Sequence, residues 1–192
     1  MSARAAGVAS SVVLLRGINL GSSNRIAMPA LREALTAAGL ENPRTYVQSG
    51  NIVLDTGSDE SELSDRVERL ITERFGLMIP AVARSGHEFA RMVAENPFPE
   101  LAEQEPKRFQ VTFLRGEPEV ALTDGLRALA TPSERVALGG REIYAWHPDG
   151  IARSKLAMKL GARGGLGREV ITTSRNWATV LTLLEMAASD AG

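Results

Sequence analysis

The chain has 192 residues and a mass of 20.6 kDa, and its 22 basic and 23 acidic residues give a formal net charge of −1. This composition is globular, which excludes a largely disordered chain and a uniformly basic nucleic-acid binder, although it allows a local basic patch. The absence of cysteine excludes disulfides, zinc–cysteine sites, iron–sulfur clusters and cysteine nucleophiles, and it favours a cytoplasmic location. No apolar run approaches the roughly 20 residues of a membrane span, so we expect no membrane association.

Hydrophobic patterning predicts a β-α-β-β-α-β order in residues 11–84, after a loose tail at residues 1–10. Pro29 is typical of a first helical turn, and Gly50 supplies the positive φ that a tight hairpin turn requires. This order is the split βαβ pattern of a ferredoxin-like sandwich. The expected strands cover residues 12–15, 45–47, 52–54 and 79–83, and the expected helices cover 29–39 and 59–76.

The same order recurs in residues 107–192, where a final helix is added. Strands are expected at 111–115, 135–138, 142–146 and, weakly, at Val170-Ile171, with helices from Pro118 to Ala130, at 151–160 and at 173–188. A repeated element order favours a duplicated α+β fold with antiparallel sheets and helices packed on them. Residues 85–106 between the halves are predicted to be a helical and acidic surface linker, which starts with a Ser85–Glu88 capping box.

Apolar residues on one face of two helices predict part of the core. The expected buried residues are Leu63, Val67, Leu70 and Phe75 in the first half and Val180, Leu181 and Leu184 in the second.

Charge is unevenly distributed despite the balanced total. Residues 151–177 contain six basic residues and one acidic residue, a net charge of +5, whereas residues 55–73 contain seven acidic and two basic residues, a net charge of −5. An anionic partner would therefore approach the later segment. Two solvated helix faces without any partner would explain the same pattern.

Three polar segments are candidates for binding chemistry. Residues 16–24 leave a predicted strand with two glycines, amides and hydroxyls beside Arg16, so backbone N–H groups could hold an anion there. Residues 46–51 place Gln48, Ser49 and Asn51 at a hairpin turn, and residues 173–177 are expected to open the final helix with Thr173 or Ser174 as N-cap. Ordinary turn and capping roles are the structural alternative for all three segments.

We expect these segments to converge on one cleft that accepts an anion. The predicted ligand-binding residues are Arg16, Asn19, Gly21, Gln48, Ser49, Asn51, Lys155, Arg175 and Asn176. No cofactor and no metal are expected, because His87 falls within a capping box, His147 precedes a turn, and neither has a second ligand at metal-binding spacing.

These segments also carry a family resemblance. The stretches Leu14–Gly21, Met28 with Leu31, Tyr46–Asn51 and Thr173–Trp177 resemble, in order, the signature blocks of the domain-of-unknown-function 1697 family. The resemblance extends from Val12 to Met186 and implies a duplicated ferredoxin-like fold, but no established reaction. The chain departs from the family pattern at Ser22, Ser23, Ala27, Ala178 and the glycine-rich residues 161–167.

Three functions remain open at this level. The first is a binding module for an anionic ligand, such as a nucleotide, a phosphorylated metabolite or nucleic acid. The second is an enzyme that acts on a phosphorylated or carboxylated small molecule, with Arg16 and Arg175 as electrostatic stabilisers and no evident general base beyond Asp55 or Glu33. The third is a structural or assembly module in which Asn19, Gln48 and Arg175 are buried and hydrogen-bonded. The sequence does not determine the oligomeric state.

Overall fold

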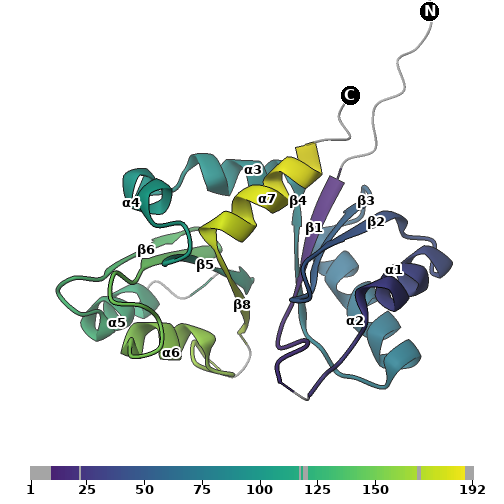
Figure 1. Ribbon diagram of the computed structural model, residues 1–192, viewed down its shortest axis with the longest axis horizontal. Coiled ribbons are helices and arrows are strands. Elements are labelled where there is room, and N and C mark those ends of the chain that lie inside the picture. Colours follow the sequence, from purple (N-terminus) through teal and green to yellow (C-terminus); the bar gives the residue numbers. More distant parts are fainter. Residues whose placement is uncertain (1–9, 22, 117, 119–120, 168–169, 189–192) are drawn as a thin grey trace, which may run out of the picture. The chain divides into compact units, whose positions relative to one another are not determined.

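The computed structural model describes residues 10–21, 23–116, 118, 121–167 and 170–188. These residues form two four-stranded antiparallel sheets with seven helices packed on them, which confirms the predicted duplicated ferredoxin-like fold (Figure 1). The chain divides into two compact units. The first contains the described residues up to Phe89 and those from Leu183 onward, and the second contains Ala90–Thr182.

The first unit has the sheet order β2-β3-β1-β4, with β1 antiparallel to both of its neighbours. Helices α1 and α2 cover one face of this sheet, with α1 against β2 and α2 against β4 (Figure 1). The elements are β1 (Ser10–Leu15), α1 (Met28–Ala37), β2 (Glu41–Tyr46), β3 (Asn51–Asp55), α2 (Glu60–Phe75), β4 (Ala81–Ser85) and the start of α3 (Gly86–Ala94).

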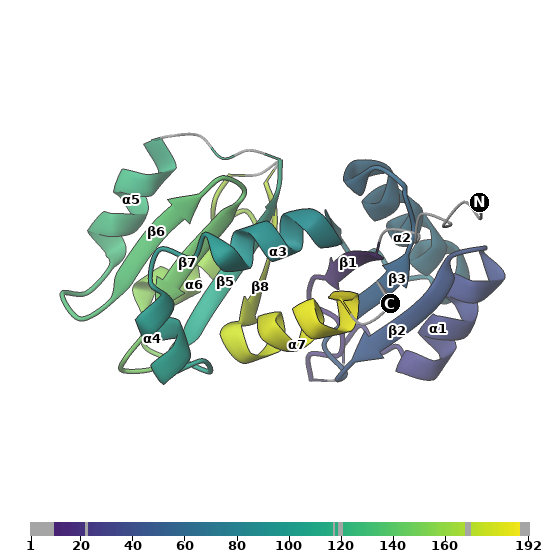
Figure 2. The same ribbon diagram turned by 90° about the horizontal axis from the view of Figure 1, so that it is seen from above.

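The second unit repeats this topology with the sheet order β6-β7-β5-β8. Helices α5 and α6 pack on one face of this sheet (Figure 2). The elements are α4 (Pro99–Gln104), β5 (Phe109–Arg115), α5 (Ala121–Leu129), β6 (Arg135–Gly139), β7 (Glu142–Trp146), α6 (Lys155–Gly161), β8 (Ile171–Asn176) and α7 (Trp177–Ala188), whose last residues belong to the first unit.

Local signals explain where α2 begins and ends. The carboxylate of Asp59 accepts hydrogen bonds from the backbone N–H groups of Ser61 and Glu62, and Glu60 and Glu62 stand in the first turn, where the helix dipole favours acidic residues. Gly76 ends the helix in the left-handed conformation with φ of 68°. The strongly acidic segment 55–73 is thus mostly a capped helix.

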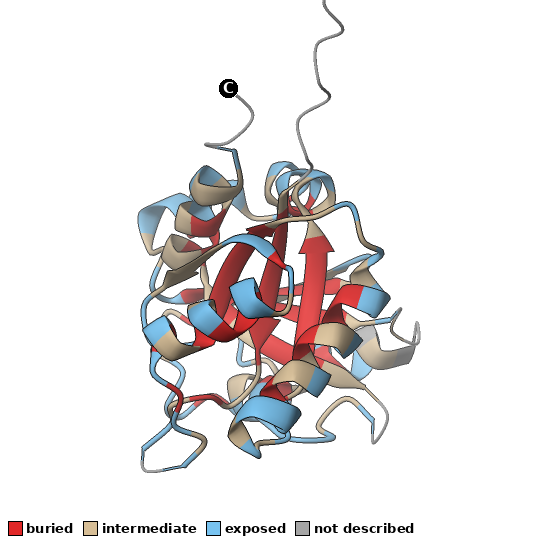
Figure 3. Cartoon of the chain, turned by 90° about the vertical axis from the view of Figure 1, so that its right-hand side faces the viewer, coloured by how far each residue is buried: buried red, intermediate tan, exposed pale blue. Residues whose placement is uncertain are grey.

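Burial of apolar side chains between helices and sheet forms the core of the first unit. Val13 and Leu15 of β1 pack with Leu63, Val67 and Ile71 of α2 in one cluster. Strands β1, β3 and β4 are almost entirely buried, whereas β2 and the outer faces of the helices are not (Figure 3). Leu70 and Phe75, which were expected to be buried, are only partly buried against this cluster.

The structure corrects two expectations about the end of the chain. Residues 173–176 belong to strand β8 and do not open the final helix, which begins at Trp177. In α7, Val180 and Leu183 are buried, Leu184 is half-buried, and Leu181 is 38% exposed. The helix is apolar around most of its circumference, so its sequence did not identify the buried face.

We predict that Leu63→Ala lowers the free energy of unfolding by about 2–5 kcal/mol, because it leaves a cavity at a fully buried position. The matched change Leu181→Ala removes the same atoms from an exposed helical position and should cost less than about 1 kcal/mol. Urea unfolding followed by circular dichroism measures both values. Equal losses would contradict the assigned burial.

Candidate functional site

The register of the first sheet brings two of the three predicted polar segments to one end of the first unit. Leu14 near the end of β1 pairs with Asn51 at the start of β3, and Leu15 pairs with Ala81 at the start of β4. The loop that follows β1 and the turn that precedes β3 therefore lie at the same end of the sheet. We call the described loop residues 16–21 and 23–27 the β1–α1 loop, and residues 47–50 the β2–β3 turn.

The side chain of Asn19 ties this loop to this turn. Its Nδ2 donates to the backbone oxygens of Gln48 (2.8 Å) and Ile26 (3.0 Å), and its Oδ1 accepts from the backbone N–H of Ile26 (2.9 Å). Asn19 has φ of 53°, a conformation that asparagine adopts more readily than most residues. The predicted ligand residue Asn19 thus serves as a brace, with both ends of its amide engaged.

Gly50 is required for the close approach of the two segments. Its backbone oxygen accepts from the N–H of Leu15 at 2.8 Å, and its φ is 69°. A Cβ atom at this position would lie 2.6 Å from both Leu15 Cβ and Ile18 Cγ2. Only glycine fits this contact without a shift of the buried neighbours.

The remaining predicted residues of the first unit divide into buried and exposed groups. Asn51 is fully buried, and its Nδ2 donates to the backbone oxygen of Tyr46 (3.1 Å) and to Ser49 Oγ (2.9 Å). Gly21, Gln48 and Ser49 are exposed, and Arg16 is half-buried. The exposed groups form the part of the loop and turn that a ligand could reach.

Val47 gives the turn an unusual backbone. It has φ of 50°, although a β-branched residue is a genuine outlier in the left-handed region. Such a conformation costs on the order of 1–3 kcal/mol and persists only where surrounding contacts enforce it. The turn is therefore held in one shape by the segments around it.

The other three predicted residues belong to the second unit. Asn176 ends β8, and its Oδ1 accepts from the N–H of Thr179, so it caps α7 in the role expected of Thr173 or Ser174. Lys155 is exposed in the first turn of α6, on the helix-covered face of the sheet. Arg175 pairs with Val111 and so projects from the opposite face. Lys155 and Arg175 therefore do not share an anion site within this unit.

Arg175 is 9% exposed, and burial lowers the pKa of its guanidinium to about 10. Its Nη1 donates to Thr173 Oγ1 (2.7 Å) and to the backbone oxygen of Ser174 (2.8 Å). The Arg175 side chain is therefore buried and hydrogen-bonded to two other residues of its own strand, β8.

Arg84 occupies the corresponding position in the first unit. Arg84 pairs with Val12 as Arg175 pairs with Val111, and both arginines stand on the last strand of their unit, two residues before the next helix. Each donates from Nη1 to the carbonyl of the preceding residue. The duplication thus includes a buried arginine, which the sequence comparison of the halves had not matched.

The sequence analysis also missed a buried polar cluster in the second unit. His147 is fully buried, and its Nδ1 lies 2.6 Å from Glu134 Oε1. The same carboxylate accepts from Ser154 Oγ (2.5 Å) and, at Oε2, from the backbone N–H of Thr131 (2.9 Å). Ser154 in turn caps α6 by accepting from the N–H of Ala157. The Glu134 carboxylate therefore joins Thr131 in the loop before β6, His147 directly after β7 and Ser154 at the start of α6.

Hydrogen bonding determines the charge state of this carboxylate. Burial alone would raise the pKa of Glu134, but the bonds from Ser154, Thr131 and His147 lower it below its ordinary value. Because an ionised carboxylate can only accept, the N–H at Nδ1 of His147 donates a hydrogen bond to Glu134. Nε2 of His147 is buried and has no hydrogen-bond partner among the described residues.

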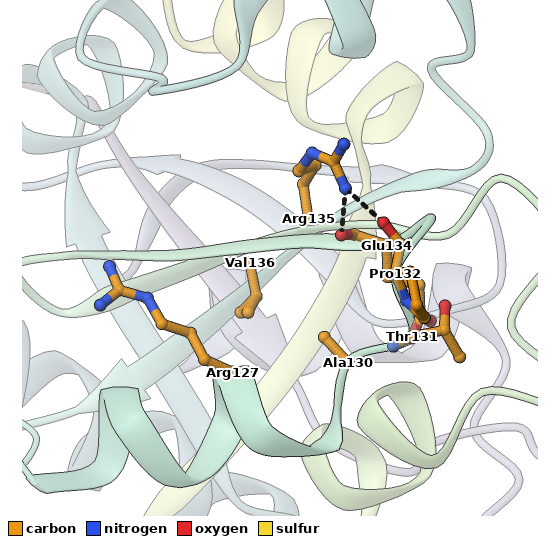
Figure 4. A pocket seen from close by; sticks show the side chains of 7 residues that line it. All are labelled: Arg127, Ala130, Thr131, Pro132, Glu134, Arg135 and Val136. Carbon is orange, nitrogen blue, oxygen red and sulfur yellow. Dashed lines mark hydrogen bonds between the residues drawn. The ribbon is translucent and has the colours of Figure 1, made fainter.

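An open pocket of about 380 Å³ lies beside this cluster, between α5 and β6. Ala130, directly after α5, and Val136 of β6 face the pocket, whereas Arg135 extends from the other side of β6 and donates to the backbone oxygens of Pro132 and Glu134 (Figure 4). Alternation along the strand separates Arg135 from Val136. Arg127 and Arg135, the two arginines that line the pocket, therefore do not point to a common anion site.

The described residues contain no cluster of three or more His, Cys, Asp or Glu side chains that could hold a metal ion. No helix among them is long and apolar enough to cross a bilayer. Asp55, the nearest acid in sequence to the β2–β3 turn, pairs with Ser10 and bonds to Arg44. It lies at the opposite end of the sheet, so it cannot act as a base at the loop and turn.

Comparison with known proteins assigns the family. Residues 8–144 match the family model described as "Protein of unknown function (DUF1697)", so the chain belongs to this family. The conserved bacterial protein SP0830 from Streptococcus pneumoniae has a similar structure, with a TM-score of 0.75 and 21% identity over 93% of this chain and 98% of that one. At this identity the likeness shows the fold alone. No curated protein matches the chain in sequence.

We predict that Asn19→Asp frees the β1–α1 loop, because aspartate keeps the acceptor for Ile26 but loses both donated bonds. Each lost bond should cost about 0.5–1.5 kcal/mol. Hydrogen exchange at the loop amides should accelerate, and urea unfolding should show the loss. Ser23→Ala, at an exposed position of the same loop, is the control and should change neither.

We predict that Glu134 stabilises the fold in a pH-dependent manner. Because its folded pKa lies below the ordinary 4.5, its contribution is fully present above about pH 4.5 and is lost as the pH falls through the folded value. Glu134→Gln should lower the free energy of unfolding by about 1–3 kcal/mol at pH 7, and its difference from the wild type should shrink in acid.

Urea unfolding at a series of pH values measures this difference. Glu103→Gln removes an exposed carboxylate from α4 in the same unit and serves as the control, with little effect expected. A Glu134→Gln difference that stays constant down to pH 3 would contradict the assigned role.

Proposed function

We propose that this member of the DUF1697 family is a binding protein that takes an anionic ligand at the β1–α1 loop and β2–β3 turn of its first unit. The observation that carries the proposal is the Asn19 brace, which fixes two segments while leaving Gln48, Ser49 and Gly21 exposed. Fixing these groups before binding lowers the entropic cost of ordering them around a ligand.

The charge around this site supports an anion. Residues 16–32 contain three arginines and no acidic residue. Arg25 is exposed near the end of the β1–α1 loop, three residues before α1, and this helix has no side-chain cap and no acid in its first turn. Guanidinium groups bind phosphate and carboxylate through paired hydrogen bonds, so Arg25 is the charged group that we assign to the ligand in addition to Arg16.

The geometry favours binding over catalysis and over a purely structural role. Asn19 and Arg175 are hydrogen-bonded within the fold as the structural alternative requires, but Gln48, which it also included, is exposed. Ser49 and Arg25 are exposed as well, and a packing role does not account for these three side chains. Neither acid considered for catalysis supports an enzyme: Asp55 is at the far end of the sheet, and Glu33 is exposed on α1. Arg175 and Asn176 are assigned to the second unit's own structure.

We predict that a screen of nucleotides and phosphorylated metabolites will identify compounds that raise the melting temperature, because a ligand of the folded state stabilises it by mass action. Arg25→Ala should weaken binding about 10- to 100-fold, the range expected for one charge-assisted contact. Calorimetric titration measures this change.

The matched control is Arg69→Ala, which removes an exposed arginine from α2 in the same unit. It should leave both binding and the unliganded melting temperature nearly unchanged. If no anion stabilises the protein, or if the two variants weaken binding equally, the proposed site is wrong.

A second candidate function rests on the second unit. Arg153, Lys155, Lys159 and Arg163 are all exposed around α6, and no acid stands between residues 150 and 167. Such a patch could contact nucleic-acid phosphates without reading sequence. Binding of an oligonucleotide that weakens steeply with salt and is reduced by Lys155→Ala and Lys159→Ala, but not by Arg25→Ala, would support this function.

A further inference from the structure

We infer that the anionic ligand of the first unit is a nucleoside phosphate, whose base contacts Leu20 and Val47. This inference rests on the proposed function and adds the chemical class of the ligand. It starts from two aliphatic side chains that the fold exposes at the polar site, with Leu20 69% and Val47 53% accessible.

The positions of these two residues are linked by one hydrogen bond. Leu20 directly follows Asn19, and Val47 directly precedes Gln48, so each is adjacent to one end of the bond from Asn19 Nδ2 to the Gln48 oxygen. On the loop side, the backbone N–H of Ser23 donates to the oxygen of Leu20. The two aliphatic side chains are therefore attached to neighbouring, fixed points of the backbone.

The conformation of Val47 strengthens the argument. A polar residue such as asparagine would adopt φ of 50° more readily and would be better solvated at an exposed turn. Single exposed apolar residues are common, but here two of them flank the same brace beside exposed polar groups. An apolar ligand portion would cover both side chains and remove their surface from water.

A nucleoside phosphate matches the complete set of groups. The flat base offers an apolar face to Leu20 and Val47, and the exposed Gln48 amide can donate to and accept from a base edge. Arg25 would hold the phosphate. Inorganic phosphate or a sugar phosphate would use only the charged part of this surface.

The test compares ligands with and without a base by calorimetric titration of the full-length protein. The probes are inorganic phosphate, ribose 5-phosphate, and the nucleoside monophosphates AMP, GMP, CMP and UMP. At least one nucleotide should bind ten or more times more tightly than ribose 5-phosphate. Leu20→Ser and Val47→Asn should each reduce this advantage several-fold and leave ribose 5-phosphate binding unchanged.

Met78→Ser is the matched control, because Met78 is also exposed and precedes β4 at the same end of the sheet, but it does not flank the brace. It should leave the nucleotide advantage intact. If ribose 5-phosphate binds as tightly as every nucleotide, or if Met78→Ser acts like the other two variants, the inference is wrong while the proposed anion site stands. If none of the phosphates binds, the proposed function fails and the inference fails with it.

Discussion

Antiparallel pairing of β1 with β3 on one side and β4 on the other decides which segments of the first unit can meet. Leu14 pairs with Asn51 and Leu15 pairs with Ala81, so the end of β1 lies beside the starts of β3 and β4. The segments that follow β1 and precede β3 and β4 therefore lie at the same end of the sheet. Asn19 and Gln48 are 29 residues apart in sequence, yet a direct hydrogen bond joins them, and the N–H of Leu15 at the end of β1 donates to the oxygen of Gly50 in the turn. Without this register the polar residues would be ordinary turn formers on separate corners.

Much of the fold was predictable because local and tertiary signals agree in it. Asp59 and Gly76 are good caps at the two ends of an amphipathic α2, and Gly50 and Gly140 have the positive φ that the two predicted hairpin turns require. The prediction was wrong where local residue preferences and tertiary strand pairing disagree. Thr173, Ser174 and Asn176 are all good N-cap residues, but tertiary pairing with β5 makes this segment a strand, and only Asn176 caps. The apolar surface of α7 likewise did not distinguish Leu181 from Leu183.

The sequence predicts which residues lie at the candidate site better than it predicts what each of them does there. Polar motifs located the loop and the turn, but no local pattern shows that Asn19 braces while Gln48 stays exposed, because this depends on strand register. Part of the cluster around Glu134 has a signal in the sequence. Thr131 and Glu134 have capping-box spacing, and the Glu134 carboxylate does accept from the Thr131 N–H. Its contact with His147, 13 residues later, follows only from the pairing of β6 with β7.

The paired arginines show that the two halves share a buried charge but differ in the residues around it. Arg84 and Arg175 hold the same strand position, and each donates to the carbonyl of the residue before it. The residue two positions earlier differs: it is Thr173 in the second half, where its hydroxyl accepts a bond from Arg175, and Val82 in the first. The same buried cation is thus solvated by a different set of protein dipoles in each copy. Exchanging Thr173 and Val82 between the halves would therefore remove a hydroxyl acceptor from Arg175 and place one beside Arg84.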